Sequence, residues 1–210
     1  MIRVGLVDTG IALSLSRSVA AAKAFGAMPP GGDAAGHGTT VARIVLHHAP
    51  QAQLLGAQAF GPGGRAEAAA IAEALRWLIV KRARVVNLSL GLAHDRGVLR
   101  AAVAEALAAG LILVASTPAR GAPVYPAAYP GVLRVTGDAR CAPGEVSALG
   151  GELADYGACP RDLDGTPGGA SLGAAHVTGL LALGLETAEI DATSILGRAV
   201  RFLGRERRTR

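Results

Sequence analysis

The chain contains 210 residues, of which 50% are hydrophobic and 18% are charged, a composition that excludes intrinsic disorder and fits a packed core. The formal net charge is +5, but no basic stripe interleaved with aromatic residues accompanies it, which argues against nucleic-acid binding. The longest apolar stretch, residues 106–115, is far too short to cross a bilayer, which argues against a membrane protein.

The length predicts one domain over residues 1–204 and a basic tail over 205–210, where four of the six residues are arginine. The first residues enter an apolar run without a secretory signal, so we expect a cytoplasmic protein. Two cysteines, Cys141 and Cys159, are too few for a disulfide framework and favour free thiols in a reducing compartment. Their spacing gives no zinc site, and we expect no metal ion or other cofactor.

Strand-like and helix-like segments alternate along the chain. In chain order, the pattern predicts a strand over residues 2–7, a helix over 37–48, a strand over 52–60, a helix over 66–81, a strand over 84–90, a helix over 98–109, and strands over 111–115 and 132–136. Continuous apolar strands between helices predict an α/β fold with a parallel sheet that is covered on both faces. In such sheets the functional residues lie in loops beyond the carboxyl ends of the strands.

Three residues far apart in the sequence suit hydrolysis by a serine nucleophile. Asp8 follows the first strand, His37 opens a helix between two glycines, and Ser171 opens a helix start crowded with small residues. A serine hydroxyl needs a histidine to take its proton and a carboxylate to hold that histidine. Each residue alone is commonly structural, as a turn residue, a packing histidine or an N-cap serine. Their order, Asp then His then Ser, is the order found in subtilisins.

Four motifs resemble those of the subtilisin-like serine proteases. They are Val-Asp-Thr-Gly at residues 7–10, Gly-His-Gly-Thr at 36–39, Val-Asn-Leu-Ser-Leu-Gly at 86–91, and Gly-Ala-Ser-Leu-Gly-Ala-Ala-His-Val-Thr-Gly at 169–179. The resemblance implies a subtilisin-like three-layer sandwich, with a mostly parallel central sheet flanked by helices. It also implies a catalytic triad of Asp8, His37 and Ser171, whereas His176 matches a structural position.

The same resemblance implies a groove for an extended peptide. Ser89, Leu90 and Gly91 are expected to pair as a strand with the substrate backbone, so that main-chain hydrogen bonds supply affinity. The turn containing Gly61 and Gly63 is expected to flank the substrate on its other side. On its Gly and Pro content alone, that turn could equally be an ordinary surface turn.

The sequence departs from the family where an asparagine normally donates to the oxyanion. Ungapped alignment places Ala119 there. Either the enzyme is slow, or Thr117 or Ser116 supplies a hydroxyl, or a gap in the alignment hides another donor. The neighbouring Arg120 aligns near the base of the primary specificity pocket and predicts an acidic or polar substrate residue.

We therefore predict a serine endopeptidase that cleaves a specific peptide or protein precursor, with a maturation complex as a candidate partner. No inhibitory propeptide and no Asp/Asn-rich calcium loop is evident, and this compactness resembles the family's dedicated maturation proteases. No nucleic-acid or membrane partner is expected. Two alternatives remain open: a catalytically weak or silent module that only binds peptides, and a ligase or cyclase that transfers the acyl group to an amine.

Overall fold

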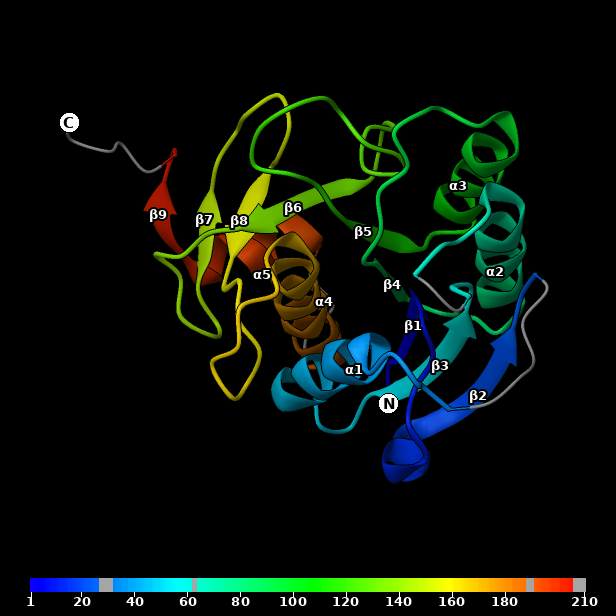
Figure 1. The fold of residues 1–210 in the computed structure, drawn as a ribbon. Helices are drawn as coiled ribbons and strands as arrows, with labels where there is room; N and C mark the ends of the chain where they lie inside the picture. Colours follow the sequence, from blue (N-terminus) through cyan, green and yellow to red (C-terminus); the bar gives the residue numbers. More distant parts are fainter. Residues whose placement is uncertain (27–31, 62–63, 188–190, 206–210) are drawn as a thin grey trace.

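A central sheet with helices on both faces forms the body of the molecule (Figure 1). The structure is a computed structural model and describes residues 1–26, 32–61, 64–187 and 191–205. The predicted site residue Gly63 and most of the predicted basic tail, 206–210, lie outside these described residues. Within them the sheet has nine strands in the order β2-β3-β1-β4-β5-β6-β8-β7-β9.

The sheet is mostly parallel. From β2 to β8 every neighbouring pair is parallel, β7 is antiparallel to β8, and β9 is parallel to β7. The carboxyl ends of β1, β4, β5 and β6 therefore meet at one edge. The strands are β1 Arg3–Asp8, β2 Val19–Ala24, β3 Gln53–Gln58, β4 Val85–Leu88, β5 Ile112–Ser116, β6 Leu133–Gly137, β7 Val146–Ala148, β8 Tyr156–Ala158 and β9 Val200–Leu203.

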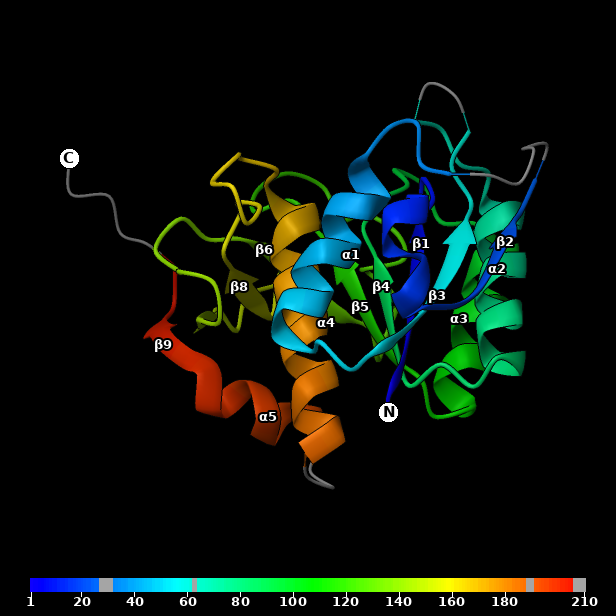
Figure 2. The same ribbon diagram turned by 90° about the horizontal axis from the view of Figure 1, so that it is seen from below.

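Helices form the two outer layers (Figures 1 and 2). The helices α1, α4 and α5 share one hydrophobic core with one face of the sheet, and α2 and α3 share another core with the opposite face. They are the 3-10 helix η1 Leu13–Ser18, α1 His37–His48, α2 Ala68–Val80, α3 Gly97–Ala108, α4 Ala170–Thr187 and α5 Ala192–Ala199.

Alternation along the strands explains why the apolar runs are continuous. In β4, Val85 belongs to the core under α1 and α4, whereas Val86 belongs to the core under α2 and α3. In β5, Val114 belongs to the core under α1 and α4, and Leu113 belongs to the core under α2 and α3. Successive side chains of a strand point to opposite faces, so a strand covered on both sides needs apolar residues at every position.

The predicted fold class is confirmed, and each predicted element exists within about two residues of its expected ends, the usual uncertainty of such boundaries. Six elements had not been predicted: η1, β2, β7, β8, α5 and β9. Strand β2 reads Val-Ala-Ala-Ala-Lys-Ala, in which Val19 is the one β-branched residue and no residue is aromatic, so its strand propensity is low, and β7 and β8 have only three residues each.

Small residues at the start of α4 allow it to lie close to the sheet. A Cβ atom at Gly173 would stand 2.6 Å from the carbonyl oxygen of Thr136 in β6, closer than side-chain atoms pack. Among the described residues, no helix has both the length and the apolar character needed to cross a membrane.

Candidate active site

Asp8 ends the central strand β1 and is only 2% exposed. Its Oδ1 accepts hydrogen bonds from the backbone N–H of Thr9 at 2.8 Å and from Nδ1 of His37 at 2.7 Å. Its Oδ2 is buried and has no donor among the described residues. A buried carboxylate with so few donors gains most from a cationic neighbour, and the imidazole of His37 can become one.

His37 is the first residue of α1, and its side chain remains 39% exposed. Because an ionised carboxylate only accepts hydrogen bonds, Nδ1 carries the proton, which leaves Nε2 free to act as a base. The hydrogen bond to Asp8 raises the pKa of His37 above its ordinary value, although burial opposes this, and the negative charges of Asp8 and Asp33 raise the pKa further. This pairing of Asp8 with His37 is what the sequence predicted for a base and its orienting carboxylate.

Asp33 organises the loop that carries His37, and sequence reasoning missed this residue. Its Oδ1 accepts from the hydroxyl of Thr9 at 2.7 Å and from the N–H of Gly36 at 2.9 Å. Its Oδ2 accepts from the N–H and the hydroxyl of Thr39 at 2.7 and 2.6 Å. These hydrogen bonds lower the pKa of Asp33, although burial opposes the shift. A signal was present, because an Asp shortly before a helix is a common capping residue.

The glycine after His37 is required by a close approach of two loops. A Cβ atom at Gly38 would lie 2.1 Å from the carbonyl oxygen of Gly10, far inside the contact distance. The N–H of Gly38 also donates to the hydroxyl of Thr9 at 3.0 Å. The two motifs that contain Asp8 and His37 are therefore joined by backbone contacts as well as by the side-chain hydrogen bond.

Ser171 is the second residue of α4, is half-buried, and lies beyond the carboxyl end of β4. Its backbone carbonyl accepts from the hydroxyl of Ser89 at 3.1 Å, and that hydroxyl accepts from the amide of Asn87 at 2.8 Å. The amide oxygen of Asn87 in turn accepts from the hydroxyl of Thr178 at 3.1 Å. This buried chain fixes α4 to β4. The polar Asn87 inside an apolar strand was the sequence signal for it.

Helices α1 and α4 lie side by side, and both begin at the edge of the sheet where β1 and β4 end (Figure 2). Nε2 of His48 in α1 is 2.8 Å from Nδ1 of the buried His176 in α4, and Nε2 of His176 is 3.0 Å from the carbonyl oxygen of Arg161. This contact locks the helix that carries His37 to the helix that carries Ser171. The hydrogen bond from Ser171 to His37 remains a prediction.

The segment that should supply the second oxyanion donor follows β5. Ala119 is exposed and has no side-chain donor. The hydroxyl of Ser116 points to the carbonyl oxygen of Leu90 at 3.5 Å, a weak hydrogen bond. Thr117 is 2% exposed, and it lines a cavity of about 170 Å³ together with Val124. Its hydroxyl has no hydrogen-bond partner among the described residues, whereas that of Ser116 does, and a role of either hydroxyl at the oxyanion remains a prediction.

The residues predicted to bind substrate lie in several places. Gly91 is exposed and forms no backbone hydrogen bond with another described residue, whereas Leu90 is buried and Ser89 uses its side chain to hold α4. The carbonyl oxygen of Gly61 accepts a hydrogen bond from the N–H of Gly64 at 3.1 Å. Arg120 is exposed and lines a separate cavity of about 390 Å³.

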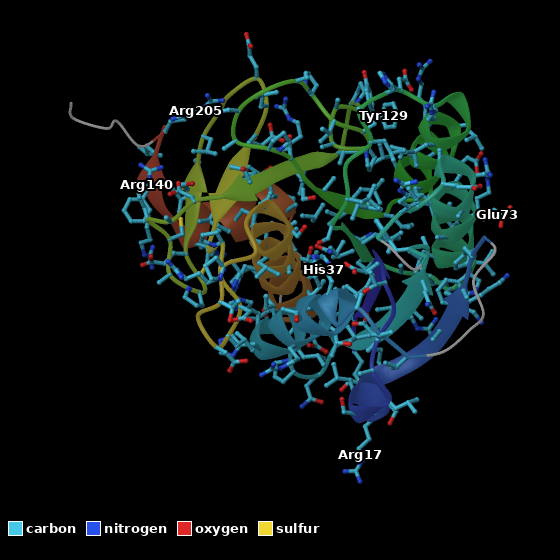
Figure 3. The ribbon with its side chains drawn as sticks, viewed as in Figure 1. Arg17, His37, Glu73, Tyr129, Arg140 and Arg205 are labelled. Atoms are coloured by element: carbon cyan, nitrogen blue, oxygen red, sulfur yellow. The ribbon has the colours of Figure 1, made fainter. Side chains whose placement is uncertain are left out.

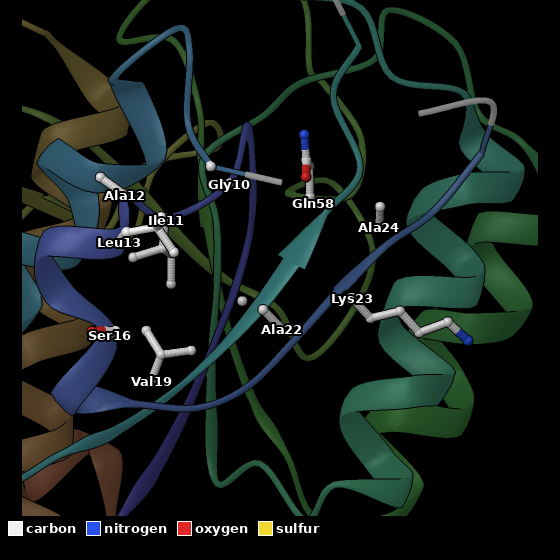
Figure 4. Close-up of a pocket in the computed structure, with 12 residues that line it drawn as sticks. Gly10, Ile11, Ala12, Leu13, Ser16, Val19, Ala22, Lys23, Ala24 and Gln58 are labelled. Carbon is white, nitrogen blue, oxygen red and sulfur yellow. The ribbon is translucent and has the colours of Figure 1, made fainter. Parts of the chain in front are cut away.

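A largely apolar cavity of about 270 Å³ lies beside the loop that follows Asp8, between η1, β2 and β3 (Figure 4). Its one charged lining residue is Lys23, whose ammonium lies 5.2 Å from the ring centre of Phe25. Elsewhere, Cys141 and Cys159 are free and buried, and burial raises the pKa of the Cys141 thiol to about 11. Among the residues that the structure describes, no group of three His, Cys, Asp or Glu side chains is arranged to hold a metal ion.

A parallel α/β sheet with a buried aspartate paired to a helix-opening histidine defines a subtilisin-like hydrolase framework. The model of the subtilase family of peptidases matches residues 2–156, a range that contains Asp8 and His37 and ends before Ser171. The chain belongs to the subtilase family.

Curated relatives are similar at moderate identity. The minor extracellular protease Epr of Bacillus subtilis strain 168 is 33% identical over 148 residues, which cover 64% of this chain and 23% of Epr. Subtilisin DY of Bacillus licheniformis is 29% identical over 207 residues, which cover 87% of this chain and 76% of that protein. The chain thus spans only about a quarter of Epr but most of the smaller subtilisin.

Solved structures with the same fold include two processing enzymes. The crystal structure of a lanthipeptide protease superposes with a TM-score of 0.69 at 18% identity, covering 93% of this chain and 78% of the other. The prenylagaramide maturation protease PagA superposes with a TM-score of 0.67 at 19% identity, covering 89% and 76%. At these identities the likeness shows a common fold.

Proposed function

We propose that this chain is a serine endopeptidase that cleaves a specific peptide or protein precursor through Asp8, His37 and Ser171. The observation that carries the proposal is the 2.7 Å hydrogen bond between Nδ1 of His37 and the buried carboxylate of Asp8. A histidine oriented in this way presents a basic Nε2 at the edge of the sheet, and α4 begins at the same edge with Ser171 in its first turn.

The reaction would proceed through an acyl-enzyme. Nε2 of His37 takes the proton of the Ser171 hydroxyl while Oγ attacks the scissile carbonyl carbon. Asp8 stabilises the imidazolium, which then protonates the leaving amine as the peptide bond breaks. A water molecule, deprotonated by the same histidine, attacks the acyl-enzyme and releases the second product with Ser171 restored.

Stabilisation of the oxyanion comes in part from the first turn of α4. Its N–H groups lack partners within the helix and attract negative charge, and the N–H of Ser171 is among them. A second donor would come from the hydroxyl of Thr117 or of Ser116. A hydroxyl in place of an amide is consistent with a slow enzyme that relies on its substrate for orientation.

The substrate we propose is an extended segment of a precursor. The free backbone of Gly91 suits addition of a peptide strand beside β4. Two structural neighbours are named for a lanthipeptide and for prenylagaramide maturation, which favours precursor processing here too. A specific candidate role is leader-peptide removal in the maturation of quinohemoprotein amine dehydrogenase, inside a maturation complex. The two buried free thiols fit a reducing compartment, so we propose a cytoplasmic enzyme.

A fluorophosphonate probe tests the triad without knowledge of the substrate. The probe loses fluoride when an activated serine attacks its phosphorus, and intact-protein mass spectrometry then records one adduct, mapped to Ser171. We expect labelling of the natural chain and none of Ser171→Ala or His37→Ala. Circular dichroism of each variant serves as the control for folding.

The outcomes separate the proposal from its two alternatives. Absence of labelling in the folded natural chain would contradict the proposal and favour a module that only binds peptides. Labelling at Ser171 followed by joined rather than cleaved peptide products, read by mass with amine-bearing acceptors present, would favour a ligase or cyclase. Cell fractionation that recovers the protein outside the cytoplasm would contradict the proposed location.

A further inference from the structure

A cavity of about 390 Å³ opens beyond the carboxyl end of β6, and nothing in the triad chemistry uses it. Two of its lining side chains are arginines that come from distant parts of the chain, Arg120 from the segment after β5 and Arg205 from the segment after β9. Arg205 is labelled in Figure 3, on the β7–β9 side of the molecule. We call this space the arginine cavity.

The arginine cavity adjoins the segment that carries Ser171. Its lining residue Gly137 lies so close to α4 that a Cβ atom there would stand 3.1 Å from the carbonyl carbon of Gly169. A second lining residue, Thr136, has its carbonyl oxygen against Gly173. The wall of the cavity therefore contacts the backbone two residues before and two residues after Ser171.

No described carboxylate pairs with either arginine of the arginine cavity. Neither Arg120 nor Arg205 has a hydrogen-bond or carboxylate partner among the residues that the structure describes. Among the described lining residues the one acidic side chain is that of Asp138, and both of its carboxylate oxygens already accept from Arg140, at 3.0, 3.2 and 2.7 Å. Asp138 is therefore already ion-paired with Arg140, which leaves Arg120 and Arg205 available to bind an anion.

Contacts of Arg140 position the backbone that leads to Arg205. Arg140 donates to the carbonyl oxygen of Gly204 at 2.7 Å and stacks over the ring of Phe202, which fixes the end of β9 beside the cavity. A Cβ atom at Gly151 would lie 3.4 Å from Nη2 of Arg205, so the guanidinium rests against the turn between β7 and β8.

We propose that the arginine cavity is a subsite for an acidic side chain of the peptide substrate, bound by Arg120 and Arg205. This inference rests on the proposed peptidase function. A guanidinium matches the planar geometry of a carboxylate and forms two parallel hydrogen bonds with it. The cavity lies too close to Ser171 for the acidic residue to be remote from the scissile bond, so the subsite selects precursors with Asp or Glu near the cleavage site.

Peptide selection on an inactive variant tests the subsite independently of cleavage. Phage-displayed random dodecapeptides are selected on folded Ser171→Ala protein at physiological salt, and bound sequences are compared with the starting library. We expect Asp and Glu to be enriched at one position relative to the others. A selected peptide and its Asp→Asn version are then synthesised, and we expect about tenfold weaker binding of the latter, the size of a charge-assisted hydrogen-bonded pair.

Variants assign that preference to the cavity. Arg120→Gln and Arg205→Gln, each combined with Ser171→Ala, should bind the two synthetic peptides almost equally. Arg17→Gln is the matched control, because Arg17 is an exposed arginine on η1 at the opposite end of the molecule (Figure 3). It removes the same net charge and should leave the tenfold preference intact.

The two proposals fail in different ways. No acidic enrichment, or a preference that survives both cavity substitutions, overturns the subsite while fluorophosphonate labelling of Ser171 still supports the peptidase. If Asp and Glu are enriched in a way that depends on both arginines but the natural chain is not labelled by the fluorophosphonate, the subsite is supported and the peptidase function is contradicted.

Discussion

The two halves of the candidate site differ in how completely they are built. On the base side, Asp8 accepts hydrogen bonds from His37 and Thr9, and Asp33 accepts from Thr9 and Thr39, all at 2.6 to 3.3 Å. On the oxyanion side, the place of the expected amide is held by Ala119 in an exposed segment. The hydrogen-bonded setting of the predicted base and the donors for the predicted oxyanion are therefore separate features of the fold, and in this chain the first is the more completely formed.

Removal of the orienting carboxylate should have the largest effect. Asp8→Asn would favour the wrong imidazole tautomer and leave no anion to stabilise the imidazolium, so the rate of Ser171 labelling should fall by about 10⁴-fold. Because the hydrogen bond to Asp8 raises the pKa of His37, its loss lowers that pKa, and the acid limb of the remaining rate moves to lower pH. Rates of fluorophosphonate labelling, measured from quenched time points at a series of pH values, report both effects. A decrease of less than tenfold would contradict the role given to Asp8.

Much of this contrast could be predicted from the sequence, for identifiable reasons. The strands around Val85 and Leu113 were predicted because burial on both faces demands unbroken apolar runs. The pairing of Asp8 with His37 was predicted because the order Asp, His, Ser and the motifs around these residues resemble those of subtilisin-like proteases, while the end of the first strand placed Asp8 at the edge of the sheet.

What could not be predicted depends on contacts between distant segments. The role of Asp33 appears only when its loop folds back onto Thr9, a contact that spans 24 positions. The arginine cavity is assembled from segments after β5, β6 and β9, and β9 itself was not predicted. Local pattern carries no information on such juxtapositions, because the same arginines on an isolated strand or loop would simply be solvated.

The contact that joins the two halves should make stability depend on pH. Burial lowers the pKa of His48 to about 4, and burial lowers the pKa of its partner His176 in the same direction. The unfolded chain then binds more protons than the folded one, so stability is greatest above about pH 6.5 and is lost as the pH falls toward 4. His48 alone accounts for about 3 kcal/mol of this loss.

Urea denaturation between pH 7 and pH 4 measures that loss. His48→Gln keeps a donor toward His176 but does not titrate there, and it should flatten the dependence of unfolding free energy on pH. The exposed neighbour His47 provides the comparison: its charge contributes to the lowered pKa values of both histidines but it does not bond to His176, so His47→Gln should flatten the dependence much less than His48→Gln does. An unchanged slope in His48→Gln would show that acid sensitivity comes from other groups.

Introducing an amide at residue 119 should supply the oxyanion side of the candidate site with the donor that it lacks. Ala119→Asn places a donor where the family alignment expects one, and the rate of fluorophosphonate labelling should rise by roughly tenfold to a hundredfold. Ala119→Asp has a similar shape without the donor and serves as the control. Equal rates in all three proteins would mean that residue 119 does not face the oxyanion.

The hydroxyl of Thr117 offers a sharper version of the same test. Thr117→Val keeps the shape of the buried side chain and removes the donor, and labelling should slow by about tenfold, below the cost of a lost amide. Ser116→Ala is the matched comparison and should have little effect, because that hydroxyl already contacts the carbonyl of Leu90. If Thr117 and an introduced amide donate to the same oxyanion, Thr117→Val should slow labelling less in the Ala119→Asn protein than in the natural chain.

The smallest effect on the labelling rate is expected for substitution of Asp33, which orders the loop that carries the predicted base His37. Asp33→Asn keeps one acceptor oxygen but loses acceptors for Thr9 or Gly36, and it removes a negative charge that helps to raise the pKa of His37. Labelling should slow by roughly fivefold, with unfolding free energy lower by about 1 kcal/mol and the acid limb shifted to lower pH.

Asp191→Asn separates this positioning role from the loss of a helix cap. Asp191 caps α5 by accepting from the N–H and the hydroxyl of Ser194, much as Asp33 accepts from Thr39, but it lies outside the active-site loops. Its substitution should lower stability by a similar amount and leave the pH profile of labelling unchanged. A shifted acid limb in Asp33→Asn alone would show that Asp33 acts on His37 through charge and loop position, whereas matching profiles in both variants would reduce Asp33 to a structural cap.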